Sequence, residues 1–108
     1  MTVQELVNQL SFTAHAMPDG EREITGVYIG DLLSWVMGRA GADEAWITIM
    51  SNRNIVAVAT LADTACILLA EGVVPDEGVA QLATEKGVNI LQSPDSAYQI
   101  AMRLRDAL

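Results

Sequence analysis

The first ten residues carry apolar side chains at the spacing of one helix face: Val3, Leu6, Val7 and Leu10. Thr2 stands just before them and Glu5 follows three positions later, which is the spacing of a capping box at a helix start. A first short helix is therefore expected here. A weak alternation over residues 11–16 predicts a short strand, and the proline- and glycine-containing segment 17–20 predicts a turn after it.

A second helix is predicted between residues 30 and 41. The chain before it, residues 22–28, is expected to be extended and to turn near Gly26. Gly30 and Asp31 open the helix, and Gly41 ends it. Its buried face is one apolar stripe: Leu32, Leu33, Val36, Met37 and Ala40.

Apolar runs and helical segments alternate regularly in the second half of the chain. Buried strands are expected at residues 46–50, 66–69 and 88–91. Helices are expected at residues 54–63, at residues 75–87 and after the 93–96 turn. The first of these helices contains three β-branched residues, so a strand is the alternative there: Ile55, Val56 and Val58.

This order of elements predicts the fold class. Strand, helix, strand, helix, strand and helix make two successive βαβ units, whose right-handed crossovers build a parallel sheet with helices on both faces. The expected architecture is α/β, a three-layer α/β/α sandwich with a mostly parallel sheet. A chain of 108 residues fits one domain, residues 1–108.

Composition and charge narrow the range of partners. The chain is 51% hydrophobic but only 5% aromatic, so its core is built mainly from aliphatic side chains. A formal net charge of -8 repels phosphate backbones and anionic lipid surfaces, which argues against nucleic acid and membrane partners. No apolar stretch approaches the roughly 20 residues that a membrane span needs, so a cytoplasmic location is expected. The high apolar fraction in a short chain favours self-association, most simply as a homodimer.

Ligands of open α/β sheets bind at the carboxyl ends of the strands. Here these ends lead into three loops, residues 51–54, 70–72 and 92–96, which we call the strand-end rim. Its candidate ligand-binding residues are Ser51, Asn52, Arg53, Asn54, Glu71, Gly72, Ser93 and Ser96. Arg53 stands out, because it is one of six cations and precedes a predicted helix whose free amides favour an anion. The alternative is that Ser51, Asn52 and Ser93 only cap helices and that Arg53 is a solvated surface residue.

Catalytic and metal-binding patterns are scarce. The only lysine, Lys86, precedes a glycine, whereas a phosphate-binding P-loop needs a lysine that follows one. His15 is the only histidine, which leaves no triad and no histidine-rich metal site. Cys66 is the only cysteine and lies in an apolar run, as an inert core residue would. We therefore expect no catalytic residue, no metal, no cofactor and no enzymatic activity, kinase activity included.

Several segments of the chain resemble the DRTGG domain, a small α/β module. The segments REITGVY at 22–28 and GDLLS at 30–34 look like its signature region, and NIVAVA at 54–59 looks like the helix that follows. EGVVPDE at 71–77 and LQSP at 91–94 resemble its later loops. Of the five-letter motif only Thr25-Gly26 is clearly retained, and Val27 stands where a second glycine is expected. The resemblance adds Thr25 and Gly26 to the candidate ligand-binding residues.

The resemblance implies a regulatory or accessory role. DRTGG domains are similar to the N-terminal domain of HPr kinase/phosphorylase, whose kinase machinery lies in a different domain. They also occur joined to CBS pairs or inside phosphotransacetylases, and similar small proteins are encoded beside iron-hydrogenase and NADH-linked redox subunits.

Two hypotheses follow. The first is a non-catalytic regulatory or ligand-sensing domain that binds a small anionic metabolite or nucleotide at the strand-end rim and the Thr25-Gly26 loop. The alternative is an accessory protein-interaction subunit of a hydrogenase or NADH-linked redox complex, with an exposed residue such as Tyr28 or Trp35 as its anchor.

Overall fold

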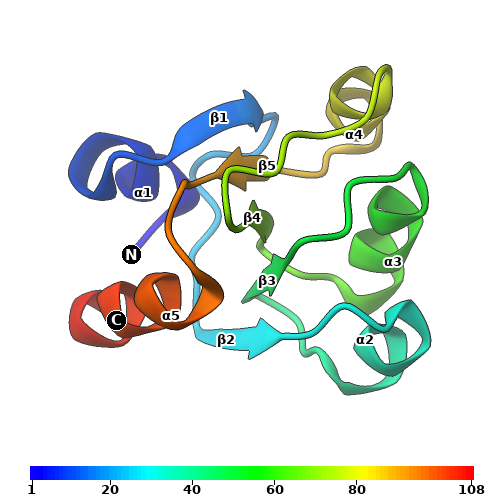
Figure 1. Ribbon diagram of the computed structural model, residues 1–108. Helices are drawn as coiled ribbons and strands as arrows, with labels where there is room; N and C mark the ends of the chain where they lie inside the picture. The colour runs from blue at the N-terminus through cyan, green and yellow to red at the C-terminus, as the bar shows by residue number, and fades with distance from the viewer.

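Five short strands form one sheet in the computed structural model, which describes all residues from 1 to 108 (Figure 1). The strands are β1 (Thr13–Ala16), β2 (Gly26–Ile29), β3 (Glu44–Thr48), β4 (Cys66–Leu69) and β5 (Ile90–Gln92). Their order across the sheet is β1-β5-β4-β3-β2. Strands β2 to β5 are parallel, and only the edge strand β1 is antiparallel, to β5. The prediction of a mostly parallel sheet is confirmed.

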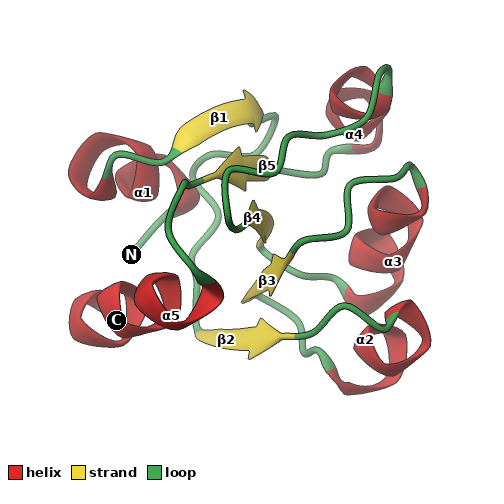
Figure 2. Ribbon diagram, viewed as in Figure 1, coloured by secondary structure: helices red, strands yellow, loops and turns green.

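Helices cover both faces of this sheet, so the three-layer α/β/α architecture is also confirmed. They are α1 (Val3–Leu10), α2 (Leu33–Arg39), α3 (Asn54–Ala62), α4 (Val79–Lys86) and α5 (Ala97–Ala107). Figure 2 shows α1 and α5 on one side of the strands and α2, α3 and α4 on the other. The longest helix, α5, has 11 residues, and none of the five combines the length and apolar character that crossing a membrane requires.

Each face of the sheet has its own core, because successive strand residues point to opposite faces. Ile47, Leu68 and Leu91 are fully buried on the α1/α5 side. Trp46, Ile67 and Ile90, one position earlier in each strand, are fully buried on the side of α2, α3 and α4. This double burial explains why the central strands read as continuous apolar runs in the sequence.

Cys66 lies on the α1/α5 side of the sheet and is buried. Burial disfavours the thiolate and raises the pKa of its thiol to about 12, with Arg22 acting weakly in the opposite direction. Cys66 is therefore a protonated core residue, as the sequence predicted.

The start of α2 and the end of β3 differ from their predicted positions for a shared reason. Helix α2 begins at Leu33, because Gly30 and Asp31 bind the neighbouring strand instead of opening a helix. The indole Nε1 of Trp46 donates to the Gly30 carbonyl oxygen at 2.8 Å. The Asp31 carboxylate accepts from Thr48 Oγ1 at 2.7 Å and from the Ile49 amide at 3.0 Å. These bonds end β3 at Thr48 rather than at residue 50.

Two further segments depart from the predictions. Gly26 makes no turn: it is the first residue of β2, pairs with Glu44 of β3 and does not have a positive φ. A Cβ at this position would lie 3.1 Å from Glu44 Oε2, so the glycine makes room for the Glu44 side chain. Helix α4 starts at Val79, not at Pro75, because Gly78 with φ 83° breaks the helical path.

Arg22 binds two aspartates, Asp43 and Asp63, at the end of the sheet where β3 begins. Its Nε donates to Asp43 Oδ1 at 2.9 Å, and its Nη2 donates to the Asp63 side chain at 2.9 Å and to the Asp63 carbonyl at 2.6 Å. Both aspartates have left-handed backbone conformations, with φ of 65° and 60°. The guanidinium therefore holds two sharp bends, one before β3 and one after α3.

Candidate functional site

The loops of the strand-end rim lie together, as expected for parallel strands. The Ser93 amide donates to the Leu69 carbonyl oxygen and the Gly72 amide donates to the Ser93 carbonyl oxygen, both at 3.0 Å. The Glu71 amide donates to the Asp95 carbonyl oxygen at 2.8 Å. Glu71 and Gly72, with φ of 60° and 74°, form the tight turn that makes these contacts possible. The backbone groups of this part of the rim are thus used within the protein.

The polar side chains of the rim also have partners in the protein. Asn52 Oδ1 accepts from the Asn54 amide at 2.9 Å, and Ser93 Oγ accepts from the Asp95 amide at 3.1 Å. The side chain of Ser96 caps α5 in a capping box. Of these three residues only Ser96 caps a helix, because Asn52 and Ser93 accept from amides two residues ahead in their own loops and α3 has no side-chain cap.

Ser51 differs from the other rim residues. Its Oγ donates to Asp76 Oδ1 at 2.8 Å, and its carbonyl oxygen accepts from the Asp76 amide at 3.0 Å. These two bonds, which we call the Ser51–Asp76 clasp, tie the loop before α3 to the loop before α4. Ser51 thus connects two loops rather than capping one helix.

Thr25 and Gly26 lie at the amino-terminal ends of the strands, whereas the rim lies at their carboxyl ends. Gly26 is paired with Glu44, the first residue of β3, whereas the rim follows the last residue of each strand. Strands of four or five residues separate the two regions by about 13 to 16 Å. The structure therefore does not bring the Thr25-Gly26 loop together with the rim.

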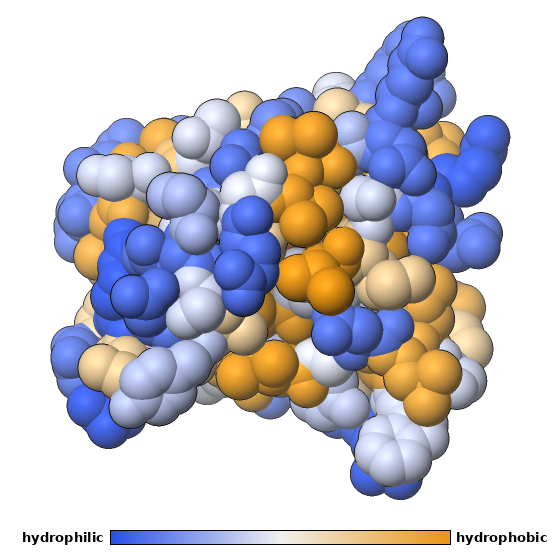
Figure 3. All heavy atoms as spheres, viewed as in Figure 1, coloured by the Kyte–Doolittle hydropathy of each residue, from blue (hydrophilic) through white to orange (hydrophobic).

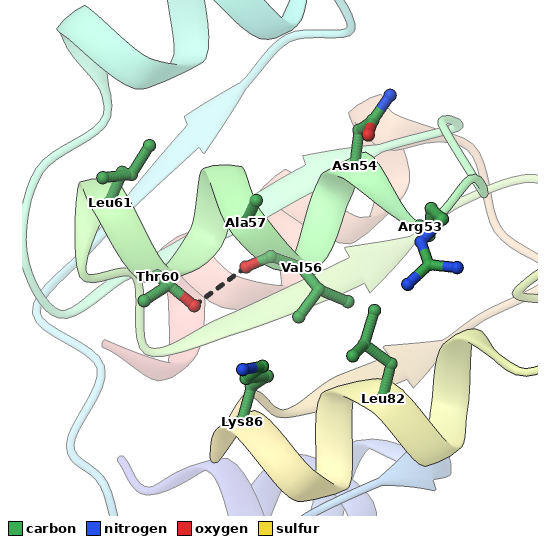
Figure 4. A pocket seen from close by; sticks show the side chains of 8 residues that line it. All are labelled: Arg53, Asn54, Val56, Ala57, Thr60, Leu61, Leu82 and Lys86. Carbon is green, nitrogen blue, oxygen red and sulfur yellow. Dashed lines mark hydrogen bonds between the residues drawn. The ribbon is translucent and has the colours of Figure 1, made fainter.

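A groove of about 500 Å³ runs between α3 and α4, and it begins at the rim residues Arg53 and Asn54 (Figure 4). Its other polar side chains are Thr60 and Lys86. Thr60 Oγ1 is occupied, because it donates to the Val56 carbonyl oxygen of its own helix at 2.9 Å. The apolar part of the lining consists of Val56, Ala57, Leu61 and Leu82.

The two cations of the groove are the two that have no aromatic or acidic partner in the protein. Of the chain's six, three form ion pairs with aspartates: Arg22, Arg103 and Arg105. Arg39 stacks on the ring of Trp35, 3.9 Å from its centroid. Arg53 and Lys86 are exposed, and both point into the groove region in Figure 4. A chain of net charge -8 therefore presents free positive charge at one groove.

Lys86 was missed as a site residue by sequence reasoning. It was assessed only as a P-loop lysine, and its place in the last turn of a helix is explained by the helix dipole. A signal was nevertheless available, since consecutive crossover helices on one face of a parallel sheet are neighbours. Arg53 at the start of one such helix and Lys86 at the end of the next flank the same groove.

Apolar side chains gather beside the rim. Figure 3 shows apolar atoms in a band down the middle of the face that it draws, with polar atoms to either side. Exposed large apolar residues lie at or after the carboxyl ends of β2, β3 and β4, and we call them the apolar patch: Ile29, Leu32, Trp35, Ile49 and Val74. Where exposed apolar residues form one contiguous surface, they are typical of an interaction site.

A comparison with solved structures supports the fold. The chain superposes with a TM-score of 0.71 and 14% sequence identity on a structure of the CBS and DRTGG domains of the regulatory region of Clostridium perfringens pyrophosphatase. That structure is a complex with an activator, diadenosine tetraphosphate. The match covers 95% of this chain and 45% of that one, so this chain spans less than half of the solved region.

The family comparison agrees with the structural one, whereas the search of curated proteins does not add a relative. A search of curated proteins gave no match. The model of the DRTGG domain family matches residues 5–107, which is nearly the whole chain and includes every strand. This protein therefore belongs to the DRTGG domain family.

Proposed function

We propose that this chain is a non-catalytic regulatory domain that senses a small anionic metabolite or nucleotide in the groove between α3 and α4. The observation that carries the proposal is the pair of unpartnered cations, Arg53 and Lys86, in one groove of an otherwise acidic protein. Free positive charge in an acidic surface attracts anions to that point and away from the rest of the molecule.

Two further observations support a regulatory role without catalysis. The fold is shared with a regulatory region whose structure holds a nucleotide activator, although that ligand belongs to the other protein. The groups most often used as base or nucleophile are also engaged elsewhere. The His15 ring is bonded to Gln92 at 3.0 Å, and Cys66 is buried with its thiol pKa raised to about 12.

The first prediction concerns Arg53. In the proposed complex its guanidinium forms a charge-assisted hydrogen bond with the anion, worth roughly 1.5 to 3 kcal/mol, so Arg53→Ala is expected to weaken binding about tenfold or more. Isothermal titration of wild type and variant with nucleotides and phosphorylated metabolites measures this. Absence of anion binding to the wild type would refute the proposal.

Two control variants separate ligand binding from capping and from net charge. Asn52→Ala removes the acceptor for the Asn54 amide and is expected to cost about 1 kcal/mol of stability with little effect on affinity. Arg105→Ala removes the same charge as Arg53→Ala at an exposed position outside the groove and is expected to change neither property appreciably. If Arg105→Ala weakened binding as much as Arg53→Ala, a specific role of the groove would be excluded.

We also propose that the chain self-associates through the apolar patch. A two-fold symmetric contact would cover this patch with a second copy of itself. Wild type is expected to sediment as a dimer at tens of micromolar protein, and Trp35→Asp with Leu32→Asp is expected to sediment as a monomer. A monomeric wild type contradicts this and leaves the patch to another protein, as in the interaction-subunit hypothesis.

A further inference from the structure

The sheet ends at β2, and the outer side of this strand is open. β2 is the last strand in the order β1-β5-β4-β3-β2, and in Figure 2 no strand continues the sheet beyond it. The other edge strand, β1, has a bulge between Ala14 and Ala16 and is contacted by α4. Bulges and covering elements keep sheet edges from pairing with other chains. β2 has no bulge, no proline and no charged residue, so this protection is absent from it.

The hydrogen bonds between β2 and β3 show which backbone groups face the open side. The Gly30 amide, directly after β2, donates to the Ile47 carbonyl oxygen of β3 at 3.2 Å. Backbone groups of successive strand residues point alternately to the two sides of the strand, so Tyr28 also faces β3. The amide and carbonyl groups of Val27 and Ile29 therefore face the open side.

Strand β3 has the matching alternation. The Thr48 carbonyl oxygen accepts from the Ala70 amide, beside β4, at 3.0 Å, so Ile47, one position earlier, faces β2. The Thr25 amide donates to the Asp43 carbonyl oxygen at 3.0 Å. Asp43 has a φ of 65° and lies before β3, so this bond belongs to the bend and not to the regular ladder.

The open part of this edge is short. Just before β2, Glu23 pairs with Thr2 in an antiparallel bridge, and the Ile24 amide donates to the Met1 carbonyl oxygen at 2.9 Å. The first residues of the chain thus occupy the edge as far as Ile24, and after β2 the chain leaves the sheet for α2 at Leu33. A partner strand about as long as β2 itself fits between these limits.

A second copy of β2 meets these conditions. Residues 24–30 carry no charged side chain, so two chains of net charge -8 can approach here without like charges directly opposite each other. With Tyr28 opposite its own copy in an antiparallel pair, Val27 of each chain lies opposite Ile29 of the other, and all the open groups are bonded. Ile29 also belongs to the apolar patch, so the strand contact continues the interface proposed there.

We infer that two copies of this chain join by antiparallel pairing of β2 with β2, which makes one continuous sheet of their two five-stranded sheets across a two-fold axis. This inference rests on the proposed self-association and gives its geometry. The backbone groups of Val27 and Ile29 bond to the second copy, and the two Tyr28 side chains meet at the axis.

Amide hydrogen exchange of the wild type tests the inference at two protein concentrations, at which sedimentation shows the monomer and the dimer. The Val27 and Ile29 amides are expected to exchange at least tenfold more slowly in the dimer, whereas the Tyr28 amide, which bonds β3 in both states, changes less. A dimer in which the first two amides exchange as fast as in the monomer would overturn the inference and leave the apolar-patch dimer standing. A wild type that stays monomeric at tens of micromolar would remove both.

A matched pair of variants tests the backbone bond itself. Ile29→Pro and Ile29→Ala both lose the half-exposed isoleucine side chain, but only proline also loses the amide donor. Both should fold, as circular dichroism would show, because this amide faces away from β3. Ile29→Pro is expected to self-associate at least tenfold more weakly than Ile29→Ala. Equal association constants of the two folded variants would show that backbone pairing at β2 is not the contact.

Discussion

The double variant Arg53→Ala/Lys86→Ala is expected to bind ATP at least a hundredfold more weakly than the wild type. Each cation contributes a charge-assisted hydrogen bond of roughly 1.5 to 3 kcal/mol. A loss of about 1.4 kcal/mol lowers the affinity tenfold. The two effects add if the cations contact different phosphate groups, as their positions at separate points of the groove suggest. Calorimetric titration with ATP provides the measurement.

The same variant should fold normally. Both side chains are exposed and neither forms an ion pair in the protein, so their removal is expected to change the free energy of unfolding by less than about 1 kcal/mol. A second double variant, Arg53→Ala/Arg105→Ala, removes the same net charge but only one groove cation. If both double variants lost the same affinity, net charge rather than the groove would control binding.

Trp46→Ala is expected to lower the free energy of unfolding by about 3 to 5 kcal/mol. Trp46 has 0% exposure at the centre of β3, and it packs with residues of α2 and α3, among them Val36 and Ile55. Its loss removes a large apolar contact and also the indole hydrogen bond to the Gly30 carbonyl oxygen. Since small domains are stable by only about 5 to 15 kcal/mol, this is a large fraction of the total. Urea denaturation followed by circular dichroism measures it.

Trp35→Ala is the matched control, because it makes the same substitution at a residue that is 53% exposed, and both variants are compared at a protein concentration at which the proposed dimer is dissociated. It loses the stacking contact with Arg39, which at an exposed site is worth about 0.5 to 1 kcal/mol. A stability loss in Trp35→Ala as large as that in Trp46→Ala would show that burial at the sheet does not determine the difference.

The layers of the fold were predictable because their signals are local. The apolar run of β4 was predicted with its observed bounds, and the capping boxes at Thr2 and Ser96 appear as short polar patterns. The start of α2 was not predictable in this way. It depends on hydrogen bonds from Trp46 and Thr48 to residues 16 and 17 positions earlier, which exist only after β2 and β3 have paired.

The site was only partly predictable for a related reason. Sequence reasoning placed Arg53 on the strand-end rim, but it left open whether the polar residues around it bind a ligand or only cap helices. The structure shows Asn52 and Ser93 bonded to their own loops. The second cation, Lys86, belongs to another helix, and the sequence reasoning did not use the order of the crossover helices, which makes that helix a neighbour of α3.

The Ser51–Asp76 clasp determines how the two helices of the groove can move. Both of its hydrogen bonds lie just before α3 and α4, at the Arg53 end of the groove. The helices are therefore held together at this end, while no side-chain hydrogen bond joins them near Lys86. If a ligand wedges the groove open, α3 and α4 splay apart about the clasp as a pivot. The displacement is then largest at the carboxyl end of α4 and passes directly to the segment that enters β5.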